Sequence, residues 1–119
     1  MAMTFPGVSE GSSYGNRAWL VGKKAFVWER PFRAADVKRF GAEPVPAGVI
    51  VGLRVEDLGE KEAVLAERRR GFFTISHFDG YAAVLVQLSV VGKRHFRESL
   101  EDAWLCCAPA ALVQQYLAR

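Results

Sequence analysis

The chain has 119 residues, of which 50% are apolar and 24% are charged, a balance that excludes a disordered protein and fits one globular domain. A domain of this size can bury a core without disulfides or a structural metal. The net charge of +3 is mildly basic. The sequence has no secretory signal and no apolar run of the ~20 residues that span a bilayer, so we expect a cytoplasmic protein without a membrane partner.

The first part of the chain predicts a loop followed by a β-hairpin. Residues 5–16 are rich in Gly, Pro, Ser and Asn, so we expect a loop with at most one helical turn. The part of this loop from Gly7 to Gly15 matches no phosphate-binding motif, so Gly11 and Gly15 are expected to permit turn conformations. Residues 19–29 carry two groups of aromatic and β-branched residues on either side of Gly22, which predicts two antiparallel strands.

A long excursion with four basic residues follows over residues 30–48. Its segment 34–40 can form two helical turns. Residues 49–55 then alternate between two faces, one of them strongly apolar, which predicts a strand.

The next predicted element is a helix that begins at Asp57. Asp57 stands in the cap position with Glu60 three residues later, and the helix is expected to continue to about Arg68. We expect its inner side to carry Leu58 and Leu65. Arg68, Arg69 and Arg70 are expected at its C-terminus, opposite the negative end of the dipole, and Gly71 is expected to stop it.

The last part of the chain predicts two strands and two helices. Residues 72–75 and 83–90 read as strands around a turn at 78–81. An amphipathic helix follows, with an apolar stripe formed by Phe96, Leu100, Ala103, Trp104 and Cys107. Pro109 can open a final helix, whose apolar side is Leu112, Val113, Tyr116 and Leu117.

This order of elements predicts a single α+β domain over residues 1–119, with an antiparallel sheet and helices on one of its faces. The pattern also predicts one shared interior, formed by Val84, Val86, Leu88, Phe96, Leu100 and Trp104. The two cysteines, Cys106 and Cys107, are adjacent on a helix, where a bridge between them would distort the backbone, so we interpret both as core or half-buried thiols.

A series of short motifs occurs along the chain in a fixed order: Pro6-Gly7-Val8, Ser13-Tyr14-Gly15, Gly22-Lys23-Lys24-Ala25-Phe26, Leu53-Arg54-Val55, Phe72-Phe73-Thr74, His77-Phe78-Asp79-Gly80-Tyr81, Val84-Leu85-Val86, Glu101-Asp102-Ala103-Trp104 and Ala108-Pro109. In this order and spacing, over about residues 5–117, the chain resembles the MmcQ/YjbR family of small bacterial proteins. Segment 27–31 is similar to an actinobacterial subgroup of that family.

The resemblance implies a frataxin-like or secretion-chaperone-like α+β fold and a label of DNA binding, with no catalytic residues. Three departures stand out. Only five residues precede Pro6, where members usually have a helix, so this helix is absent or the chain starts late at Met1. Ala110 and Ala111 replace a basic pair, which removes two positive charges from a candidate phosphate-facing site, and Ala82 replaces a common proline.

Three polar residues in two loops, Tyr14, His77 and Tyr81, form a candidate small-molecule site. His77 lies beside Asp79 and can be imagined as a base oriented by a carboxylate. The alternative, which we favour, is that His77 and Tyr81 make hydrogen bonds that fix the turn. His95 is expected to be solvated, and with two histidines and no cysteine cluster we predict no metal site, no cofactor and no catalytic constellation.

Ten of the sixteen Lys and Arg residues fall in three clusters: Arg30, Arg33, Lys38 and Arg39; Arg68, Arg69 and Arg70; and Lys93, Arg94 and Arg97. If the clusters converge on one face they form a phosphate-tracking surface, and if they scatter they act as solubility charges and helix-dipole partners. Trp19, Trp28 and Tyr14 can stack bases beside such a surface, or belong to the core.

We rank three hypotheses in the following order. The first is a non-catalytic DNA-binding module that acts through the basic clusters. The second is a protein- or peptide-binding adaptor that self-associates, as a homo-oligomer, through apolar surface left uncovered by the missing N-terminal helix. The third is an enzyme or small-molecule binder that uses the region of Tyr14, His77 and Tyr81.

Overall fold

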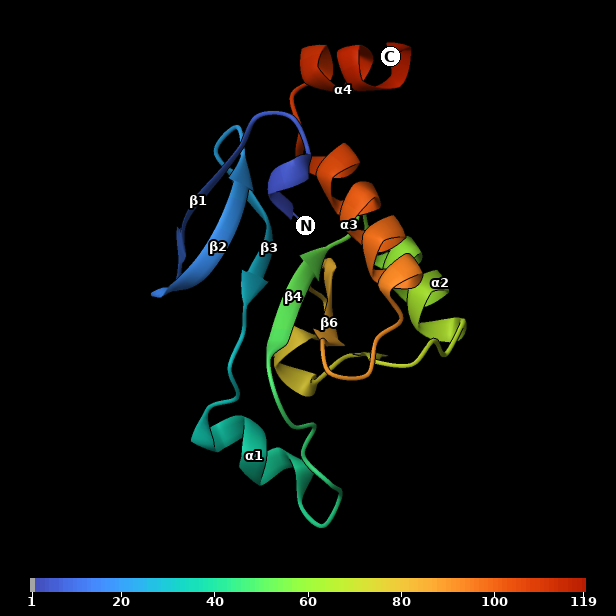
Figure 1. Cartoon of the computed structure of the whole chain (residues 1–119). Coiled ribbons are helices and arrows are strands. Elements are labelled where there is room, and N and C mark those ends of the chain that lie inside the picture. The colour runs from blue at the N-terminus through green and yellow to red at the C-terminus, as the bar shows by residue number, and fades with distance from the viewer. Residues whose placement is uncertain (1) are drawn as a thin grey trace.

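The computed structural model describes residues 2–119, and its central feature is a six-stranded antiparallel sheet in the order β1-β2-β3-β4-β6-β5 (Figure 1). Met1, and with it the question of the native start, lies outside the described residues. The strands are β1 (Val8–Ser13), β2 (Asn16–Val21), β3 (Lys24–Glu29), β4 (Ile50–Arg54), β5 (Phe72–Phe73) and β6 (Ala83–Gln87). The helices are α1 (Ala34–Phe40), α2 (Leu58–Ala66), α3 (Lys93–Cys107) and α4 (Ala110–Ala118), with single 3-10 turns η1 (Ala2–Thr4) and η2 (Ser76–Phe78). The predicted α+β class with an antiparallel sheet is confirmed.

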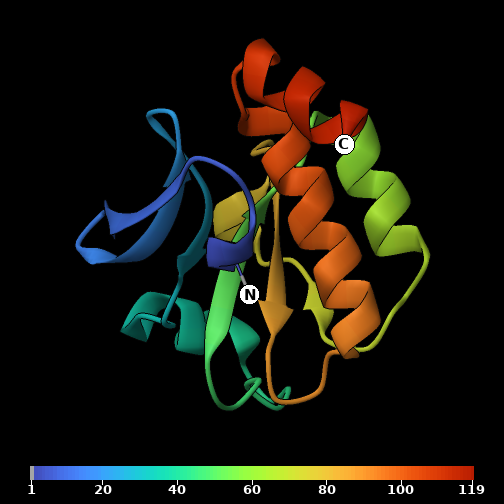
Figure 2. The ribbon, with the colours of Figure 1, turned by 45° about the horizontal axis from the view of Figure 1, so that its top comes forward.

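The main core lies between one face of the sheet and helices α2 and α3 (Figure 2). Val84 and Val86 of β6 belong to the same buried cluster as Leu100 and Trp104 of α3, and none of the four is more than 1% exposed. Leu88 and Phe96 are partly buried and pack against this cluster. The predicted shared interior is therefore confirmed.

A second, smaller core occupies the opposite face of the sheet. It is formed by Ala18, Trp28, Ile50, Phe78, Ala83 and Leu85. Because Ala83 and Leu85 are fully buried here while Val84 and Val86 are buried against α3, strand β6 has two interior faces. The strand ends at Gln87, earlier than predicted, where the N–H of Val91 donates to the Gln87 carbonyl and the chain turns.

The predicted loop over residues 5–16 is wrong, because residues 8–13 form β1, an edge strand paired in full register with β2. Four of its six residues are exposed. The sequence of β1 therefore does not need the apolar alternation that identifies a half-buried strand, and it gives no strand signal. Tyr14 and Gly15 form the turn with φ values of 51° and 81°, the pattern of a two-residue I′ hairpin. The turn interpretation thus holds for Gly15, whereas Gly11 lies inside the strand, where an added Cβ would come within 2.9 Å of Leu20.

Helix α2 begins as predicted but ends earlier. The Asp57 carboxylate accepts the N–H of Glu60, as expected of an N-cap. The helix stops at Ala66 because Arg68 adopts a left-handed conformation with φ 52°, so the three arginines follow the helix rather than close it. Leu65 packs against the main core, but Leu58 is 49% exposed and is not on the inner side.

The C-terminal prediction is largely confirmed. The stripe on α3 faces the core, and Cys106 and Cys107 are free thiols, half-buried and buried. Pro109 is the N-cap of α4. On that helix Tyr116 is buried and packs against Trp104, whereas Leu117 is 66% exposed.

Candidate functional site

A cavity of about 400 Å³ lies beside the second core, between the β1–β2 turn and η2. We call it the Arg30 cavity. It is lined by Ser13, Tyr14, Asn16, Trp28, Arg30, Arg33, His77, Phe78 and Tyr81. The structure therefore brings together Tyr14, His77 and Tyr81, the three polar residues of the third hypothesis, although they come from loops more than sixty residues apart in the sequence.

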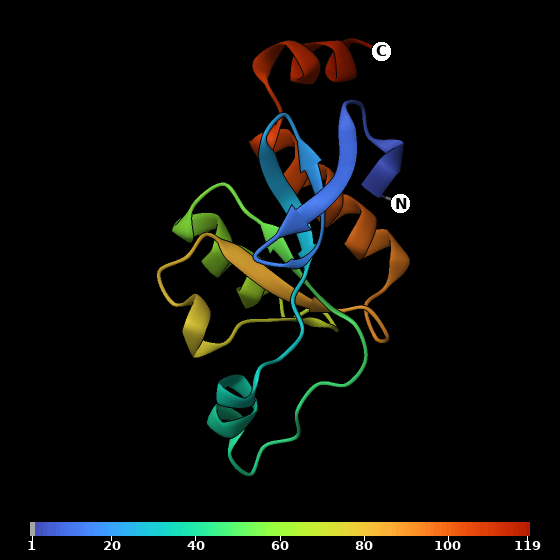
Figure 3. The ribbon, with the colours of Figure 1, turned by 90° about the vertical axis from the view of Figure 1, so that its left-hand side faces the viewer.

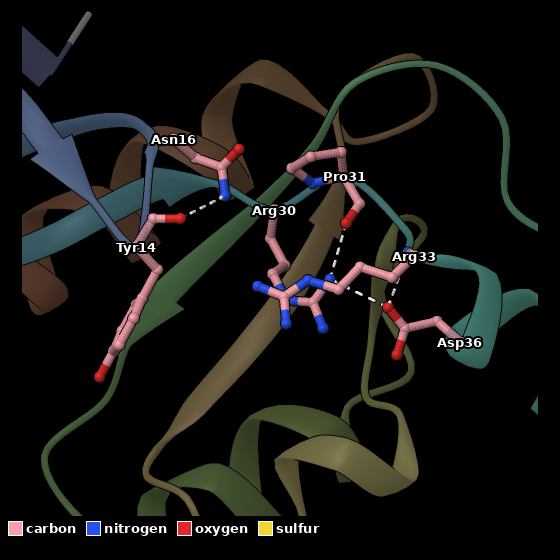
Figure 4. A network of polar contacts seen from close by, with 6 residues as sticks. All are labelled: Tyr14, Asn16, Arg30, Pro31, Arg33 and Asp36. Atoms are coloured by element: carbon pink, nitrogen blue, oxygen red, sulfur yellow. Dashed lines mark hydrogen bonds and ion pairs between the residues drawn. The ribbon is translucent and has the colours of Figure 1, made fainter.

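Arg30 is the most deeply buried polar group of this cavity, with 5% of its surface exposed. Its Nη1 donates to the Asp36 carboxylate at 3.0 Å and to the Pro31 carbonyl at 2.7 Å (Figure 4). Its guanidinium also lies 5.6 Å from the centre of the Phe78 ring. The remaining Nη2 is buried without a hydrogen-bond partner. A buried donor without a partner costs free energy, and it offers a binding position to an acceptor brought by a ligand.

Asp36 fixes Arg30 from the first turn of α1. Its side chain is 4% exposed and also accepts the backbone N–H of Arg33 at 2.9 Å, so it caps the helix and neutralises the arginine at the same time. Burial alone would raise the pKa of the Asp36 carboxyl, but the Arg33 N–H and the Arg30 guanidinium outweigh it and hold this pKa below its ordinary value.

Arg33 supplies a second cation to the same cavity. It stands at the N-cap of α1, is exposed, and its side chain points back toward Arg30 (Figure 4). Among residues 2–119, no carboxylate lies within ion-pair distance of the Arg33 guanidinium. The cavity thus holds one arginine neutralised by Asp36 and one that is not, which gives it a net positive charge.

Aromatic side chains form the inner wall of the cavity. Trp28 and Tyr81 lie with ring centroids 6.5 Å apart. Arg54 holds this pair, since its guanidinium is 5.6 Å from the Trp28 ring and its Nη2 donates to the Tyr81 hydroxyl at 2.9 Å. The Trp28 indole lies across Gly52 of β4, where an added Cβ would come within 2.5 Å of Trp28 Cε2.

Gly52→Ala is expected to push the Trp28 indole out of this wall. No real Cβ tolerates such a contact with a ring, so the indole or the strand must shift, at a cost of about 1–3 kcal/mol of unfolding free energy. Urea unfolding measures the loss, and the NMR shift of the Trp28 indole N–H reports the displacement. Gly59→Ala on α2, where a Cβ meets only the Asp57 carboxylate at 3.4 Å, is the matched control.

A buried lysine positions the loop that carries His77 and Tyr81. Lys61 of α2 is 7% exposed, and its Nζ donates to the carbonyls of Phe78 at 2.6 Å and Tyr81 at 2.9 Å. Burial lowers the pKa of this ammonium. Within the described chain the His77 ring contacts Phe78 and makes no hydrogen bond, so the expected role in fixing the turn is wrong for His77. Tyr81 does make a side-chain hydrogen bond, since its hydroxyl accepts from Nη2 of Arg54.

Lys61→Met keeps the aliphatic stem of the side chain and removes both hydrogen bonds. We expect a loss of about 1–3 kcal/mol in unfolding free energy, the range for hydrogen bonds from a charged group. Hydrogen exchange should become faster in residues 76–82 and stay unchanged in β2. Equal protection of this loop in both proteins would contradict the role assigned to Lys61.

The ten basic residues of the first hypothesis do not gather on a single face. Arg30 lies against the second core, while Lys93, Arg94 and Arg97 lie on α3 at the other face of the sheet (Figure 3). The arginines at 68–70 come directly before Gly71, where an added Cβ would lie 3.0 Å from the Cβ of Val91, two residues before the start of α3. Lys38 and Arg39 are exposed on α1. Besides Arg30, two of these basic residues form ion pairs with carboxylates: Arg69 with Glu67, and Arg94 with Glu98.

The three aromatic residues that were candidates for stacking on bases also lie in different parts of the structure. Trp19 packs against the main core and lies 5.0 Å from the Arg17 guanidinium. Trp28 is 6% exposed and belongs both to the second core and to the cavity wall. Tyr14, in contrast, is 87% exposed. His95 is exposed, as expected.

The adaptor hypothesis expected uncovered apolar surface near the start of the chain. An apolar groove of about 150 Å³ is present there, beside η1, and Ala2, Trp19, Leu88 and Phe96 belong to its lining. Self-association through it stays a prediction, which light scattering tests.

Three mycobacterial proteins match the chain: the uncharacterized proteins Mb2600 of Mycobacterium bovis and MT2646 and Rv2570 of Mycobacterium tuberculosis. Each is 48% identical over 103 residues, which cover 84% of this chain and 79% of the relative. The chain belongs to their family. No family model and no solved structure matches it, so the resemblance to the MmcQ/YjbR family stays a prediction.

Two negative findings concern this family member over residues 2–119. The side chains of His, Cys, Asp and Glu form no group of three that could hold a metal ion. In the same part of the chain, the helices are too short or too polar to cross a bilayer.

Sequence reasoning missed Arg54, Lys61 and Asp36 in the site. Arg54 interrupts an otherwise apolar strand, and a charge at the end of a buried strand is the signal that could have indicated it. Asp36 stands three residues after Arg33 at the start of the predicted helical turns, the spacing of a capping carboxylate. The two hydrogen bonds of Lys61 are made to backbone carbonyls in a distant loop, so no pattern in the sequence indicates them.

Proposed function

We propose that this protein binds a small organic anion that carries an aromatic ring, in the Arg30 cavity. The observation that carries the proposal is the unpartnered Nη2 of Arg30, buried in the wall of a cavity that also contains Arg33. Two arginines on one side of a cavity match the two oxygens of a carboxylate or the oxygens of a phosphate.

The aromatic residues of the lining determine the rest of the ligand. Trp28, Phe78 and Tyr81 present ring surfaces, so a planar apolar group fits beside them. A volume of about 400 Å³ lies within the range of small-ligand sites. Because the exposed Arg33 side chain extends toward Arg30 (Figure 4), it is expected to turn outward and contact the anion when the ligand enters.

Calorimetric titration with benzoate, indole-3-carboxylate and phenyl phosphate tests the proposal, with neutral benzamide as the uncharged comparison. We expect binding of at least one anion and none of benzamide. Arg33→Gln should weaken the binding about tenfold or more, the loss of one charge-assisted hydrogen bond. Arg39→Gln, on an exposed position of α1 outside the cavity, is the matched control and should leave affinity unchanged.

Two results would overturn this function: no binding of any of the three anions at millimolar concentration, or equal affinities for the Arg33 and Arg39 variants. The shift of the Trp28 indole N–H in the NMR spectrum places the ligand independently, because Trp19 and Trp104 do not line this cavity.

DNA binding is the second candidate, and the exposed Tyr14 ring, which lines the same cavity as Arg33, favours it in a single-stranded form. Fluorescence anisotropy with a labelled single strand and with a duplex tests it. We expect binding at low salt that falls steeply as salt rises, and a weaker complex for Tyr14→Ala. No binding at about tens of micromolar, within the usual range for non-specific contacts, ends this candidate.

A further inference from the structure

The two cysteines form a pair of neighbouring thiols at the end of α3 that the Arg30 cavity does not use. Their Sγ atoms are 3.8 Å apart. Cys106 is half-buried and its thiol donates to the Ala103 carbonyl at 3.2 Å, while Cys107 is 6% exposed. Neither sulfur is required by the fold as a bridge, since both are free.

Both thiols line a second cavity, of about 550 Å³, which we call the dithiol cavity. Its wall also contains Lys24 of β3, Arg54 of β4 and Tyr81. The cavity gives a small molecule of the size of a substituted benzene room to reach the sulfurs.

The surroundings favour one thiolate in the pair. The hydrogen-bond contact between the two thiols, together with Arg54 and Lys24, lowers the pKa of Cys107 to about 7, against the effect of burial. The pKa of Cys106 is raised, because of its contact with the Cys107 sulfur and because the thiol is partly buried. Cys107 is therefore the thiol of the pair that ionises more readily, and a thiolate is the nucleophilic form of cysteine.

Direct bonding between the two sulfurs fits this geometry poorly. A disulfide needs an S–S distance of about 2.05 Å, and adjacent helical residues reach it only by distorting the backbone. An atom that bonds to both sulfurs requires much less movement, since the sulfurs then stay apart. The geometry suits a thiophilic atom that accepts two thiolates.

We propose that Cys106 and Cys107 form a two-sulfur binding site for organic arsenic(III) oxides. In the reaction the Cys107 thiolate attacks arsenic and the Cys106 sulfur forms the second bond. Two As–S bonds form, the arsenic–oxygen double bond is broken, and the two thiol protons leave with that oxygen as one molecule of water. Arsenic stays trivalent, so no oxidant or reductant is needed.

Phenylarsine oxide is the probe, with native mass spectrometry and thermal unfolding as the readouts. We expect one phenylarsenic group per chain, with the mass of one water lost, and a higher Tm, because the folded chain holds the two sulfurs ready. Cys106→Ser and Cys107→Ser should each weaken binding about 100-fold or more, because each leaves a single sulfur. Both variants are first shown to fold by circular dichroism.

The change in Tm distinguishes two cases. In one, the folded chain forms the binding site; in the other, two adjacent cysteines react equally well in an unfolded chain. A Tm that falls or stays unchanged, or a single-cysteine variant that binds as tightly as the wild type, overturns the proposal. Arg33→Gln is the control and should bind phenylarsine oxide like the wild type, since Arg33 does not line the dithiol cavity. The outcome is thus independent of the function proposed for the Arg30 cavity.

Discussion

Asp36→Ala is expected to lower the free energy of unfolding by about 3–5 kcal/mol, the cost of leaving a buried charge without its partner. In the wild type the Arg30 and Asp36 side chains are 7% and 4% exposed and 3.0 Å apart. Without the carboxylate, Arg30 keeps the Pro31 carbonyl and the Phe78 ring but has no counter-ion. The N–H of Arg33 loses its acceptor as well, which weakens the start of α1. Urea unfolding at pH 7 measures the change.

Glu98→Ala is the matched control, because it removes the carboxylate of an ion pair on the surface. The Arg94 and Glu98 side chains are 88% and 51% exposed, so their pairing contributes less than about 1 kcal/mol. Similar losses in the two variants would show that burial does not determine the value of the Arg30–Asp36 pair. The double variant Arg30→Met with Asp36→Leu should recover part of the stability, since an apolar pair leaves no unpaired charge.

The same pair predicts a dependence on pH. The folded-state pKa of Asp36 is below its ordinary value of about 3.9, so its contribution to stability is complete above that value and is lost as the pH falls through the folded-state pKa. The stability difference between the wild type and Asp36→Ala should therefore be constant from pH 7 to about pH 5. Below about pH 4 it should shrink.

Elements whose apolar spacing points toward a core could be predicted from the sequence. The stripe on α3 and the apolar positions of β4 and β6 determine the main interior, because burial of these side chains is the dominant favourable term. Strand β1 cannot be predicted in this way, because its residues are held by backbone hydrogen bonds to β2 and most of them are exposed. The end of α2 differs from the prediction because Arg68, a residue type that ordinarily avoids positive φ, adopts the left-handed conformation before Gly71 is reached.

The candidate site could be predicted only in part, for a related reason. Tyr14, His77 and Tyr81 were grouped correctly as polar residues in two loops, since Gly and turn signals mark both segments. From the sequence alone, Arg30 does not differ from the other nine basic residues of the three clusters. Its burial depends on Asp36, on Phe78 and on the way the chain leaves β3, and these are contacts between segments that no local pattern records.

Whether Arg30 is buried or exposed matters for function, because a buried cation and a surface cation recognise ligands in different ways. Exposed clusters such as residues 68–70 attract phosphates at long range and are screened by salt. Arg30 acts at contact distance, in surroundings where water competes less for its free donor. The location of one arginine therefore moves the favoured hypothesis from a DNA surface to a small-ligand cavity.

Trp104→Ala is expected to lower the unfolding free energy by about 3–5 kcal/mol, as large truncations in a core do. Trp104 is fully buried. The centroid of its ring lies 4.9 Å from that of Tyr116 on α4 and 6.0 Å from that of Phe5. Its Nε1 donates to the Pro6 carbonyl at 3.0 Å. This one side chain thus joins α3 to α4 and to the segment before β1, and urea unfolding with hydrogen exchange follows both effects.

Trp104→Phe separates the packing of the ring from the hydrogen bond. Phe keeps most of the apolar surface but lacks the indole N–H, so the Pro6 carbonyl loses its donor and the loss should be about 1–2 kcal/mol. In Trp104→Ala the amides of α4 should exchange faster than those of β4 and β6, because Tyr116 loses the surface on which it packs. If both regions lose protection equally, α4 and the sheet unfold as one unit, and Trp104 is not the contact that fixes the C-terminal helix.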